Sequence, residues 1–291
     1  MILVTGANGQ LSRALQKELI NDELYVASSS ELNLINQNKI QILLKKINPS
    51  LIIHTAAFTK VDDAEIQKEL VMEINFELTK IIANFAHKNN IPLIFFSTDY
   101  VFDGLKNTPY IEDDFREPIN IYGLSKKYAE DYIVQLCEKF IIFRISWIYD
   151  LQGSNFVNTI LSIIQSQNVI KVVNDQFGSP TPTFFIAKIV KKVIELTYKN
   201  SFPWGIYHLS TSGIASWYEF SKLIINNIKF INQRFNRKIH IEPVSSANYS
   251  RLANRPKYSK LCCDKIEKVL GMNMMDWKES FIQMVKINSN E

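Results

Sequence analysis

The stretch Ile2-Leu3-Val4-Thr5-Gly6-Ala7-Asn8-Gly9-Gln10-Leu11 opens the chain and decides how the rest is interpreted. A short apolar run leads into a tight turn with two glycines, and an amphipathic segment over 13–20 follows. This order predicts a strand, a turn and a helix whose free backbone N–H groups point at a phosphate. We therefore predict a dinucleotide-binding loop, although many glycine turns are only structural and Ser12 replaces the third glycine of the pattern.

The same alternation continues to about residue 150. Apolar runs typical of buried strands alternate with amphipathic, helix-like segments, the strands lying at 24–27, 51–54, 93–96 and 140–144. Such alternation favours a parallel sheet covered on both faces. We therefore predict an α/β fold, with a doubly wound, Rossmann-like parallel sheet over residues 1–149.

The pattern changes after residue 150. We expect a smaller, mixed α/β domain over 150–291 that binds the substrate, with a segment at about 170–198 returning to the sheet. The segment 174–183 contains Pro180 and Pro182 among polar residues, and is expected to be a loop too polar for the core.

Composition excludes several classes of protein. A hydrophobic share of 46% and a charged share of 21% are ordinary for a globular protein. The net charge of +4 comes from scattered basic residues, which argues against nucleic acid but suits an anionic small molecule. No apolar run approaches the roughly 20 residues of a membrane span, and no charged leader precedes the first strand. We expect no membrane partner.

Cysteine and histidine usage points to a reducing environment without a metal site. Cys137, Cys262 and Cys263 cannot form an even set of disulfides, so a cytoplasmic location is expected. The four histidines are isolated in the sequence, and we interpret each as structural or exposed. We predict no metal ligands.

Tyr122 and Lys126 are the strongest candidates for chemistry. Residues four apart share one face of a helix, which brings the phenol and the ammonium close together. An ammonium stabilises a phenolate, so the pKa of Tyr122 is expected to fall below its ordinary value of about 10 and to suit a general acid. Thr98, beyond the strand at 93–96, would give a second hydrogen bond to a carbonyl oxygen that gains charge. Chance matches to Tyr-x-x-x-Lys are common, so the interpretation depends on the glycine loop and Thr98.

The cofactor preference is less clearly encoded. An acidic residue after the second strand would bind the ribose of NAD, and an arginine the 2′-phosphate of NADP. The sequence has Ser28-Ser29-Ser30 there, which can bind either, and we interpret Arg13 as near enough to reach a phosphate. We predict NADPH and leave NADH open.

Seven blocks in one order resemble the dTDP-4-dehydrorhamnose reductase family, within the extended short-chain dehydrogenase/reductase superfamily. They span nearly the whole chain, at residues 6–11, 59–65, 97–102, 122–126, 143–149, 174–183 and 254–256. The resemblance implies hydride transfer from NADPH or NADH to the C4 carbonyl of dTDP-4-dehydro-L-rhamnose. Asn33 departs from the family, which tends to have aspartate beside the adenine.

The resemblance also implies roles for particular residues. Tyr122 would protonate the C4 oxygen, Lys126 would bind the nicotinamide ribose, and Thr98 would complete the catalytic set. The dTDP-sugar would be bound by Thr98, Asp99, Tyr122, Trp147 and Arg255. The cofactor would be bound by Gly6, Asn8, Gly9, Gln10, Leu11, Asn33, Leu34, Ala56, Ala57, Phe58, Phe96, Tyr122 and Lys126.

Several alternatives stay open. Trp147 is also interpretable as core, Arg255 as the partner of a buried carboxylate, and Asn75 as a brace for the site or a cap of a turn. The whole chain could act on another nucleotide-linked 4-keto sugar as a reductase or epimerase. It also looks similar to the NADP-binding regulatory subunit of methionine adenosyltransferase, which is a partner protein. A homodimer is compatible with the resemblance.

Overall fold

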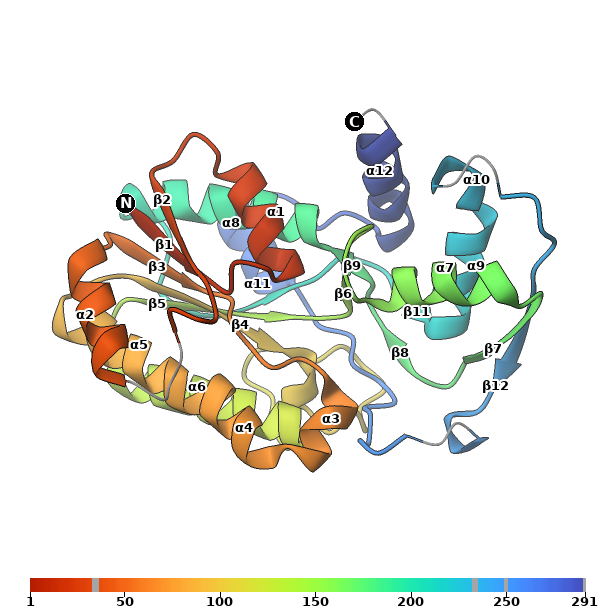
Figure 1. Cartoon of the computed structure of the whole chain (residues 1–291), viewed down its shortest axis with the longest axis horizontal. Coiled ribbons are helices and arrows are strands. Elements are labelled where there is room, and N and C mark those ends of the chain that lie inside the picture. Colours follow the sequence, from red (N-terminus) through yellow and green to blue (C-terminus); the bar gives the residue numbers. More distant parts are fainter. Residues whose placement is uncertain (33–36, 232–234, 249–250, 290–291) are drawn as a thin grey trace.

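A parallel sheet forms the centre of the larger part of the protein in the computed structural model, which describes residues 1–32, 37–231, 235–248 and 251–289. Its six strands in those ranges follow the order β10-β5-β4-β3-β1-β2, and every neighbouring pair is parallel (Figure 1). The strands are β1 Ile2–Thr5, β2 Leu24–Ala27, β3 Leu51–His54, β4 Leu93–Thr98, β5 Phe140–Ile145 and β10 Gly205–Leu209. The predicted doubly wound sheet is confirmed.

Helices cover both faces of this sheet. Every residue of β3 and β4 is buried, as is typical of parallel strands between two helical layers. The first face carries α1 Gln10–Glu18, α8 Thr183–Tyr198 and α11 Asp264–Leu270. The opposite face carries α2 Gln37–Ile47, α5 Leu78–Lys88 and α6 Ile121–Leu136.

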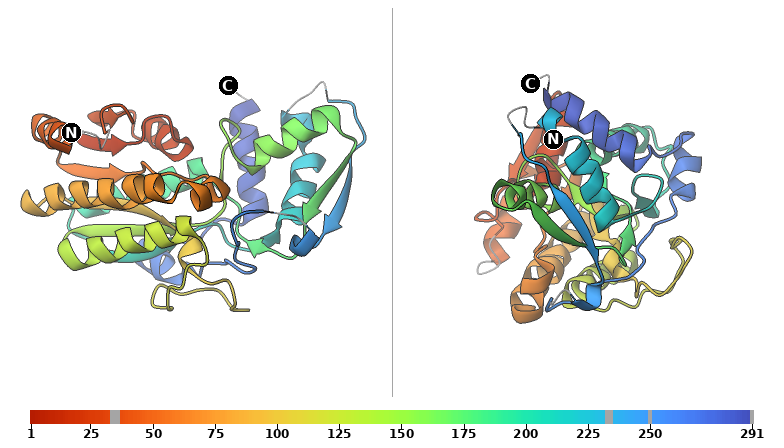
Figure 2. Two further views of the ribbon diagram at one scale, coloured as in Figure 1. Left: turned by 60° about the horizontal axis from the view of Figure 1, so that its bottom comes forward. Right: turned by 90° about the vertical axis from the view of Figure 1, so that its right-hand side faces the viewer.

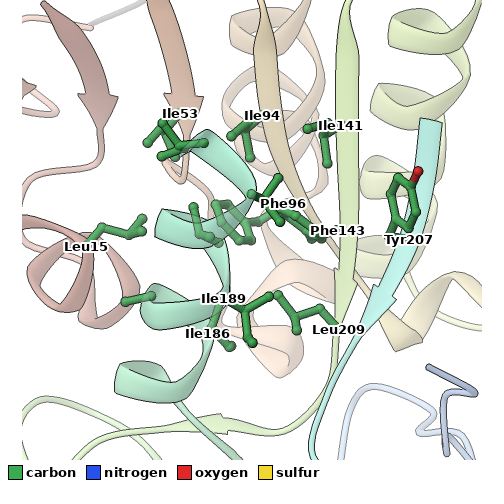
Figure 3. Packing of buried hydrophobic residues seen from close by; sticks show 14 of the residues in the cluster. Leu15, Ile53, Ile94, Phe96, Ile141, Phe143, Ile186, Ile189, Tyr207 and Leu209 are labelled. Atoms are coloured by element: carbon green, nitrogen blue, oxygen red, sulfur yellow. The ribbon is translucent and has the colours of Figure 1, made fainter. Parts of the chain in front are cut away.

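The core on the first face joins segments that lie far apart in the sequence. Leu15 of α1 and Ile186 of α8 pack in one cluster with Phe96 of β4 and Phe143 of β5 (Figure 3). Each fully buried side chain of this size contributes roughly 1.5–3 kcal/mol. This packing fixes α8, from the second half of the chain, against the first sheet.

The chain between β3 and α5 is irregularly helical. A π-helical turn over Glu73–Glu77 comes directly before α5. Two short helices precede this turn, α3 Val61–Ile66 and α4 Lys68–Met72. Such π-helical turns are frequent at functional sites, and this one carries Asn75.

A smaller lobe lies beside the sheet (Figure 2). Its parallel pair of strands is packed against helices in a separate apolar cluster. The lobe contains β7 Val169–Val173, β12 His240–Val244, α7 Phe156–Ser166, α9 Trp217–Asn226, α10 Ile228–Ile231 and α12 Trp277–Ser289. These elements all follow residue 150 in the chain.

The segment expected to return to the sheet divides in two. α8 packs on α1 and on the sheet, whereas β7 pairs with β12 in the lobe. Burial along β7 largely alternates, which suits a sheet with one covered face, while the central strands are buried on both faces. β10, which lies beyond the predicted range, adds the outer strand next to β5.

The prediction that 174–183 is too polar for the core is wrong. This segment forms β8 Phe177–Gly178, which pairs with β11 Ala215–Ser216, and β9 Thr181–Pro182, which pairs with β6 Ile148–Tyr149. Ser179 and Thr181 are fully buried because their hydroxyls donate to the carbonyls of Gly213 and Ser179. A satisfied hydroxyl is tolerated in a core where an unpaired one is not.

Within the part of the chain that the structure describes, short 3-10 turns lie over Asp99–Val101 and Ser246–Asn248. Within the described ranges, no helix has the length and apolar character that crossing a bilayer requires.

Candidate active site

A cavity of about 1250 Å³ lies between the carboxyl ends of the sheet strands and the lobe. Open α/β sheets bind ligands at this edge, where the strand order reverses, and here the reversal lies between β1 and β3. The volume exceeds the usual 300–1,000 Å³ of a small-molecule pocket. The cavity therefore has room for a dinucleotide and a second ligand.

The glycine loop forms one end of this cavity. Gly6 has φ +77°, and a Cβ at that position would lie 2.9 Å from the Ala56 Cα, so only glycine lets β1 and β3 approach here. Gly9 is the N-cap residue of α1, and it has no side chain that could bond the N–H groups of the first turn. The helix begins at Gln10, earlier than predicted. The N–H groups of its first turn suit an anion. Ser12, at the position of the third glycine, is fully buried.

Arg13, which the sequence suggested for a phosphate, is not among the residues that line the cavity. Its guanidinium donates to the Asn8 carbonyl at 2.6 Å and to the Gln152 carbonyl at 3.4 Å. Arg13 therefore fastens the glycine loop to the segment after β6.

The end of β2 contains a carboxylate that sequence reasoning overlooked. Glu31 accepts hydrogen bonds from the Ser28 N–H at 2.8 Å, the Ser28 hydroxyl at 2.6 Å and the Tyr25 hydroxyl at 2.5 Å. These bonds hold the pKa of Glu31 below its usual value, the Ser28 hydroxyl contributing most.

The predicted adenine contacts Asn33 and Leu34 lie outside the described residues.

The predicted cofactor residues that follow β3 do not all line the cavity. Ala56 and Ala57 line the cavity, as does Phe96 of β4. The backbone of Phe58 instead binds Asn75, with its N–H donating to Oδ1 at 2.7 Å and its carbonyl accepting from Nδ2 at 3.1 Å. Asn75 also donates to Ser125 at 2.9 Å, so it braces α6 against the loop after β3.

The structure brings Tyr122, Lys126 and Thr98 together on the cavity wall. The Asn120 side chain caps α6 by accepting from the Gly123 N–H at 2.8 Å, which fixes the first turn where Tyr122 lies. Gly123 lets this turn touch the 3-10 turn after β4, since a Cβ there would lie 2.1 Å from the Tyr100 carbonyl oxygen. The first turn of α6 is thus held directly against Thr98 and its neighbours.

Lys126 is buried, with only 2% of its surface exposed. Loss of water lowers its pKa to about 7, and the nearby Glu130 carboxylate opposes that change. The ammonium nitrogen lies 3.9 Å from the centroid of the Phe95 ring. A ring face attracts a cation and replaces part of the lost solvation.

The expected fall in the pKa of Tyr122 is wrong for this structure. Burial raises that pKa well above the ordinary value, and the hydrogen bond with Thr98 opposes the rise only in part. The neutral phenol is favoured because transfer of a phenolate out of water costs more than one hydrogen bond returns. Tyr122 therefore holds its proton firmly at neutral pH.

Asp99 lies directly beside this group and is also buried. Burial raises its pKa to about 6, against hydrogen bonds from Ser259, Ser146 and Thr98. The Ser146 hydroxyl donates to Oδ2 at 2.9 Å and the Thr98 hydroxyl donates to Oδ1 at 3.1 Å. These bonds hold the carboxyl group in one orientation on the cavity wall.

Trp147 lines the cavity and is held in a slot. Its indole stacks on Trp217 with ring centroids 3.4 Å apart and planes 1° apart. Gly178 provides the space, because a Cβ there would lie 2.5 Å from the Trp147 ring. Trp147 has φ +47°, a backbone strain of about 1–3 kcal/mol for a residue other than glycine. The surrounding contacts stabilise that conformation.

Arg255 also lines the cavity and pairs with a carboxylate. Its Nη2 lies 3.0 Å from Asp62 Oδ2, and Arg251 Nη1 lies 3.2 Å from the same atom. Arg255 Nε is buried and has no hydrogen-bond acceptor among the described residues. The Ser97 hydroxyl on the cavity wall is also buried, and it too has no hydrogen-bond partner among the described residues. Ser97 was not among the predicted site residues, although its position before Thr98 was a signal.

The parts of the site follow a characteristic order along the chain: a glycine loop, a hydroxyl at the end of β4, and a Tyr-x-x-x-Lys pair at the start of the next helix. On a doubly wound sheet, this order is that of the short-chain dehydrogenase/reductases. Fold and site together define an oxidoreductase that uses a nicotinamide dinucleotide.

Comparisons with known proteins give the family. The family model described as the RmlD substrate binding domain matches residues 1–289. The dTDP-4-dehydrorhamnose reductase of Aggregatibacter actinomycetemcomitans is 33% identical, with 96% of each chain covered. The structure of a Clostridium acetobutylicum dTDP-4-dehydrorhamnose reductase has TM-score 0.90 at 34% identity, covering 99% of both chains. That of the Bacillus anthracis enzyme in complex with NADP has TM-score 0.90 at 35% identity, covering 98% of both. This chain belongs to the dTDP-4-dehydrorhamnose reductase family.

Proposed function

We propose that this protein reduces the C4 carbonyl of dTDP-4-dehydro-L-rhamnose, giving dTDP-L-rhamnose. The observation that carries the proposal is one cavity wall on which Tyr122, Lys126 and Thr98 lie together, continuous with the glycine loop. The match to dTDP-4-dehydrorhamnose reductases over nearly the whole chain supports the choice of substrate.

The residues present fit a nicotinamide dinucleotide. Gly6 lets the turn after β1 lie against Ala56 on the cavity wall, and the first turn of α1 offers N–H groups to a pyrophosphate. The unpaired Ser97 hydroxyl on the wall offers a further polar contact. NADPH, which supplies the hydride when bound, is the proposed cofactor, with NADH as the second choice.

Tyr122 is proposed as the general acid. Its raised pKa keeps the phenol protonated until the substrate oxygen gains negative charge. The Thr98 hydroxyl, whose one proton is donated to Asp99 Oδ1 in the structure, then turns to donate it to that oxygen. The Lys126 ammonium, one helical turn from Tyr122, favours departure of the phenolic proton at that moment, because it stabilises the phenolate.

The sugar nucleotide is proposed to bind along the lobe side of the cavity. Asp99 and Trp147 are held in fixed orientations, which suits recognition of sugar hydroxyls and of the ring face. The unpaired Nε of Arg255 suits one oxygen of the diphosphate. Residues 1–149 would then bind mainly the cofactor and 150–291 mainly the substrate.

Location and assembly are separate proposals. All three cysteines, Cys137, Cys262 and Cys263, are free thiols in the structure, which supports a reducing compartment such as the cytoplasm. A homodimer is proposed from exposed apolar side chains such as Tyr128 and Val134 on α6. Light scattering on the purified protein measures the assembly state.

The proposed function is tested by a substrate screen at fixed NADPH or NADH. The purified protein is expected to oxidise the cofactor when given dTDP-4-dehydro-L-rhamnose, and the product is identified by mass spectrometry and sugar analysis. Turnover only with another nucleotide-linked 4-keto sugar would move the assignment to that substrate. Tight NADPH binding without turnover on any member of the screen would favour a binding role like that of a regulatory subunit.

A further inference from the structure

Three buried side chains form a hydrogen-bonded row behind the cavity wall. Thr5 ends β1, His54 ends β3 and Thr79 lies in α5, and at most 1% of each is exposed. His54 Nδ1 lies 2.8 Å from the Thr5 hydroxyl and Nε2 lies 3.0 Å from the Thr79 hydroxyl. No local pattern around His54 indicates that this histidine joins two parts of the site.

Counting donors at Thr5 fixes the role of one ring nitrogen. The Thr5 oxygen accepts from the backbone N–H groups of Thr55 and Ala56, each at 3.1 Å. A hydroxyl has two acceptor positions and one proton, so both acceptor positions are occupied. Thr5 must donate its proton to His54, and Nδ1 must therefore carry no hydrogen.

Counting at Thr79 gives the same answer independently. The Thr79 hydroxyl donates its one proton to the Asn75 carbonyl at 2.7 Å. It can only accept from His54, so Nε2 must carry the hydrogen. Both ends of the row thus require the neutral Nε2–H form of the ring, and every bond of the row runs in one direction from Thr5 to Asn75.

The row ends at Asn75, which braces α6, the helix that carries Tyr122. Asn75, whose carbonyl accepts from Thr79, donates its side-chain N–H to Ser125, and the Ser125 hydroxyl donates to the Tyr122 carbonyl at 2.7 Å. At its other end, Thr5 holds the amides of the loop that lines the cavity after β3. The row therefore connects the cofactor side of the cavity to the helix turn that carries Tyr122.

We propose that His54, fixed in its Nε2–H tautomer between Thr5 and Thr79, is a positioning residue that sets the distance between the bound dinucleotide and Tyr122. This inference rests on the proposed function for its kinetic part only. A donor at both ring nitrogens would break the bond to Thr5, and the opposite tautomer would break the bonds to both threonines.

The ring is suited to this role because it stays neutral. Burial, together with the positive charge of Lys126, lowers the pKa of His54 to about 3. The ring is therefore neutral at pH values well above about 3, and there the row keeps its direction.

Nitrogen-15 NMR of the intact protein, labelled on histidine, tests the tautomer without any substrate. We expect one histidine to show a protonated Nε2 and an unprotonated Nδ1, unchanged between about pH 5.5 and 8, and this signal to vanish in His54→Phe. A His54 signal of the Nδ1–H form, or of the imidazolium, would overturn the proposal.

Steady-state kinetics test the positioning role with matched variants. Thr79→Val removes the hydroxyl at constant shape, whereas Thr79→Ser retains it. We expect Thr79→Val and His54→Phe to lower kcat by about 10-fold or more, since small misplacements cost up to about 10²-fold, with the Kd for NADPH changed less than kcat. Thr79→Ser should retain the parent kcat. The double variant should be no worse than the poorer single one, because both remove the same link.

Two outcomes would overturn the kinetic part: parent-like kcat in folded Thr79→Val, or equal losses in Thr79→Val and Thr79→Ser. The kcat of each variant is divided by the kcat of the unsubstituted protein, measured with the substrate that the screen identifies. Failure of that protein to turn over any substrate would contradict the proposed function alone, because the NMR result does not depend on it.

Discussion

Lys126 carries an ammonium group in a place where water cannot solvate it. Two neighbouring groups replace part of that solvation. One is the Phe95 ring, whose face the nitrogen lies over, and the other is the negative charge of the Glu130 carboxylate, one turn further along α6. A charge held in this way destabilises the fold, and catalytic groups commonly carry such costs. The same burial keeps the neighbouring Tyr122 protonated.

Replacing Tyr122 with phenylalanine removes the proposed proton donor and leaves the ring in place. We expect turnover to fall by at least ~10²-fold, because general acid catalysis contributes about 10²–10⁴-fold. NADPH affinity, measured by fluorescence titration, should stay within a few-fold of the parent. Turnover near that of the parent would remove Tyr122 from its role.

Replacing Lys126 with methionine removes the charge at similar shape, and its effect on stability should depend on pH. Below about pH 7 the lysine is charged in both folded and unfolded states, so the full desolvation cost opposes folding. Between about 7 and 10.5 the folded protein loses this proton while the unfolded chain keeps it, so the cost fades as pH rises.

The gain in free energy of unfolding for Lys126→Met is therefore expected to be largest at about pH 6, exceeding about 1 kcal/mol, and smaller at about pH 9. Urea unfolding at the two pH values measures it, with the exposed Lys88→Met as control. A gain that is equal at both pH values would show that Lys126 is not desolvated as described.

At the scale of elements, the start of α6 determines where Tyr122 lies. Asn120 caps the helix, and Gly123 allows it to touch the turn at Asp99–Val101. A methyl group at position 123 would lie 2.1 Å from the Tyr100 carbonyl oxygen, a backbone atom that cannot rotate away. The helix start and the strand end must then separate.

We expect Gly123→Ala to lower the free energy of unfolding by about 1–3 kcal/mol, as overpacking typically does, even though alanine favours helices. Turnover should fall as well, since Tyr122 moves with the first turn. Gln135→Ala, at an exposed position of the same helix, is the control and should leave both quantities nearly unchanged. Thermal unfolding and initial rates provide the readouts, and a stabilised Gly123→Ala would contradict this account.

At the scale of the whole molecule, the two parts meet around the cavity through a few polar and aromatic contacts. Asp62, just after β3, pairs with Arg251 and Arg255 from the last quarter of the chain. Trp147, after β5, stacks on Trp217 of the lobe. These contacts place the C-terminal segments over the same cavity that the sheet opens into.

Asp62→Asn tests whether this pairing prepares Arg255 for a diphosphate. We expect the KM for the sugar nucleotide to rise several-fold, because the guanidinium loses its anchor. The free energy of unfolding should change by less than about 1 kcal/mol, since the pair is partly exposed. Asp63→Asn, which breaks only an exposed pair with Lys60, is the matched control. A lowered KM would show that Asp62 competes with the ligand instead.

Much of this molecule was predictable from local patterns. The strand–glycine–helix start, the alternation up to residue 150 and the Tyr122–Lys126 spacing are all short-range features, and each predicted strand lies within a few residues of its predicted bounds. The pairing of β7 with β12, and the burial of the Ser179 hydroxyl against the Gly213 carbonyl, were not predictable. They depend on partners 30 to 70 residues away.

The sequence by itself determined the class of fold, the family and the identity of the chemical groups, because hydrophobic period, turn glycines and residue spacing act over a few residues of chain. Only the tertiary structure decided the ionisation of Tyr122, Lys126 and His54, the slot that holds Trp147 and the partner of Arg255. These properties depend on loss of water and on contacts between distant segments, and neither exists until the chain has folded.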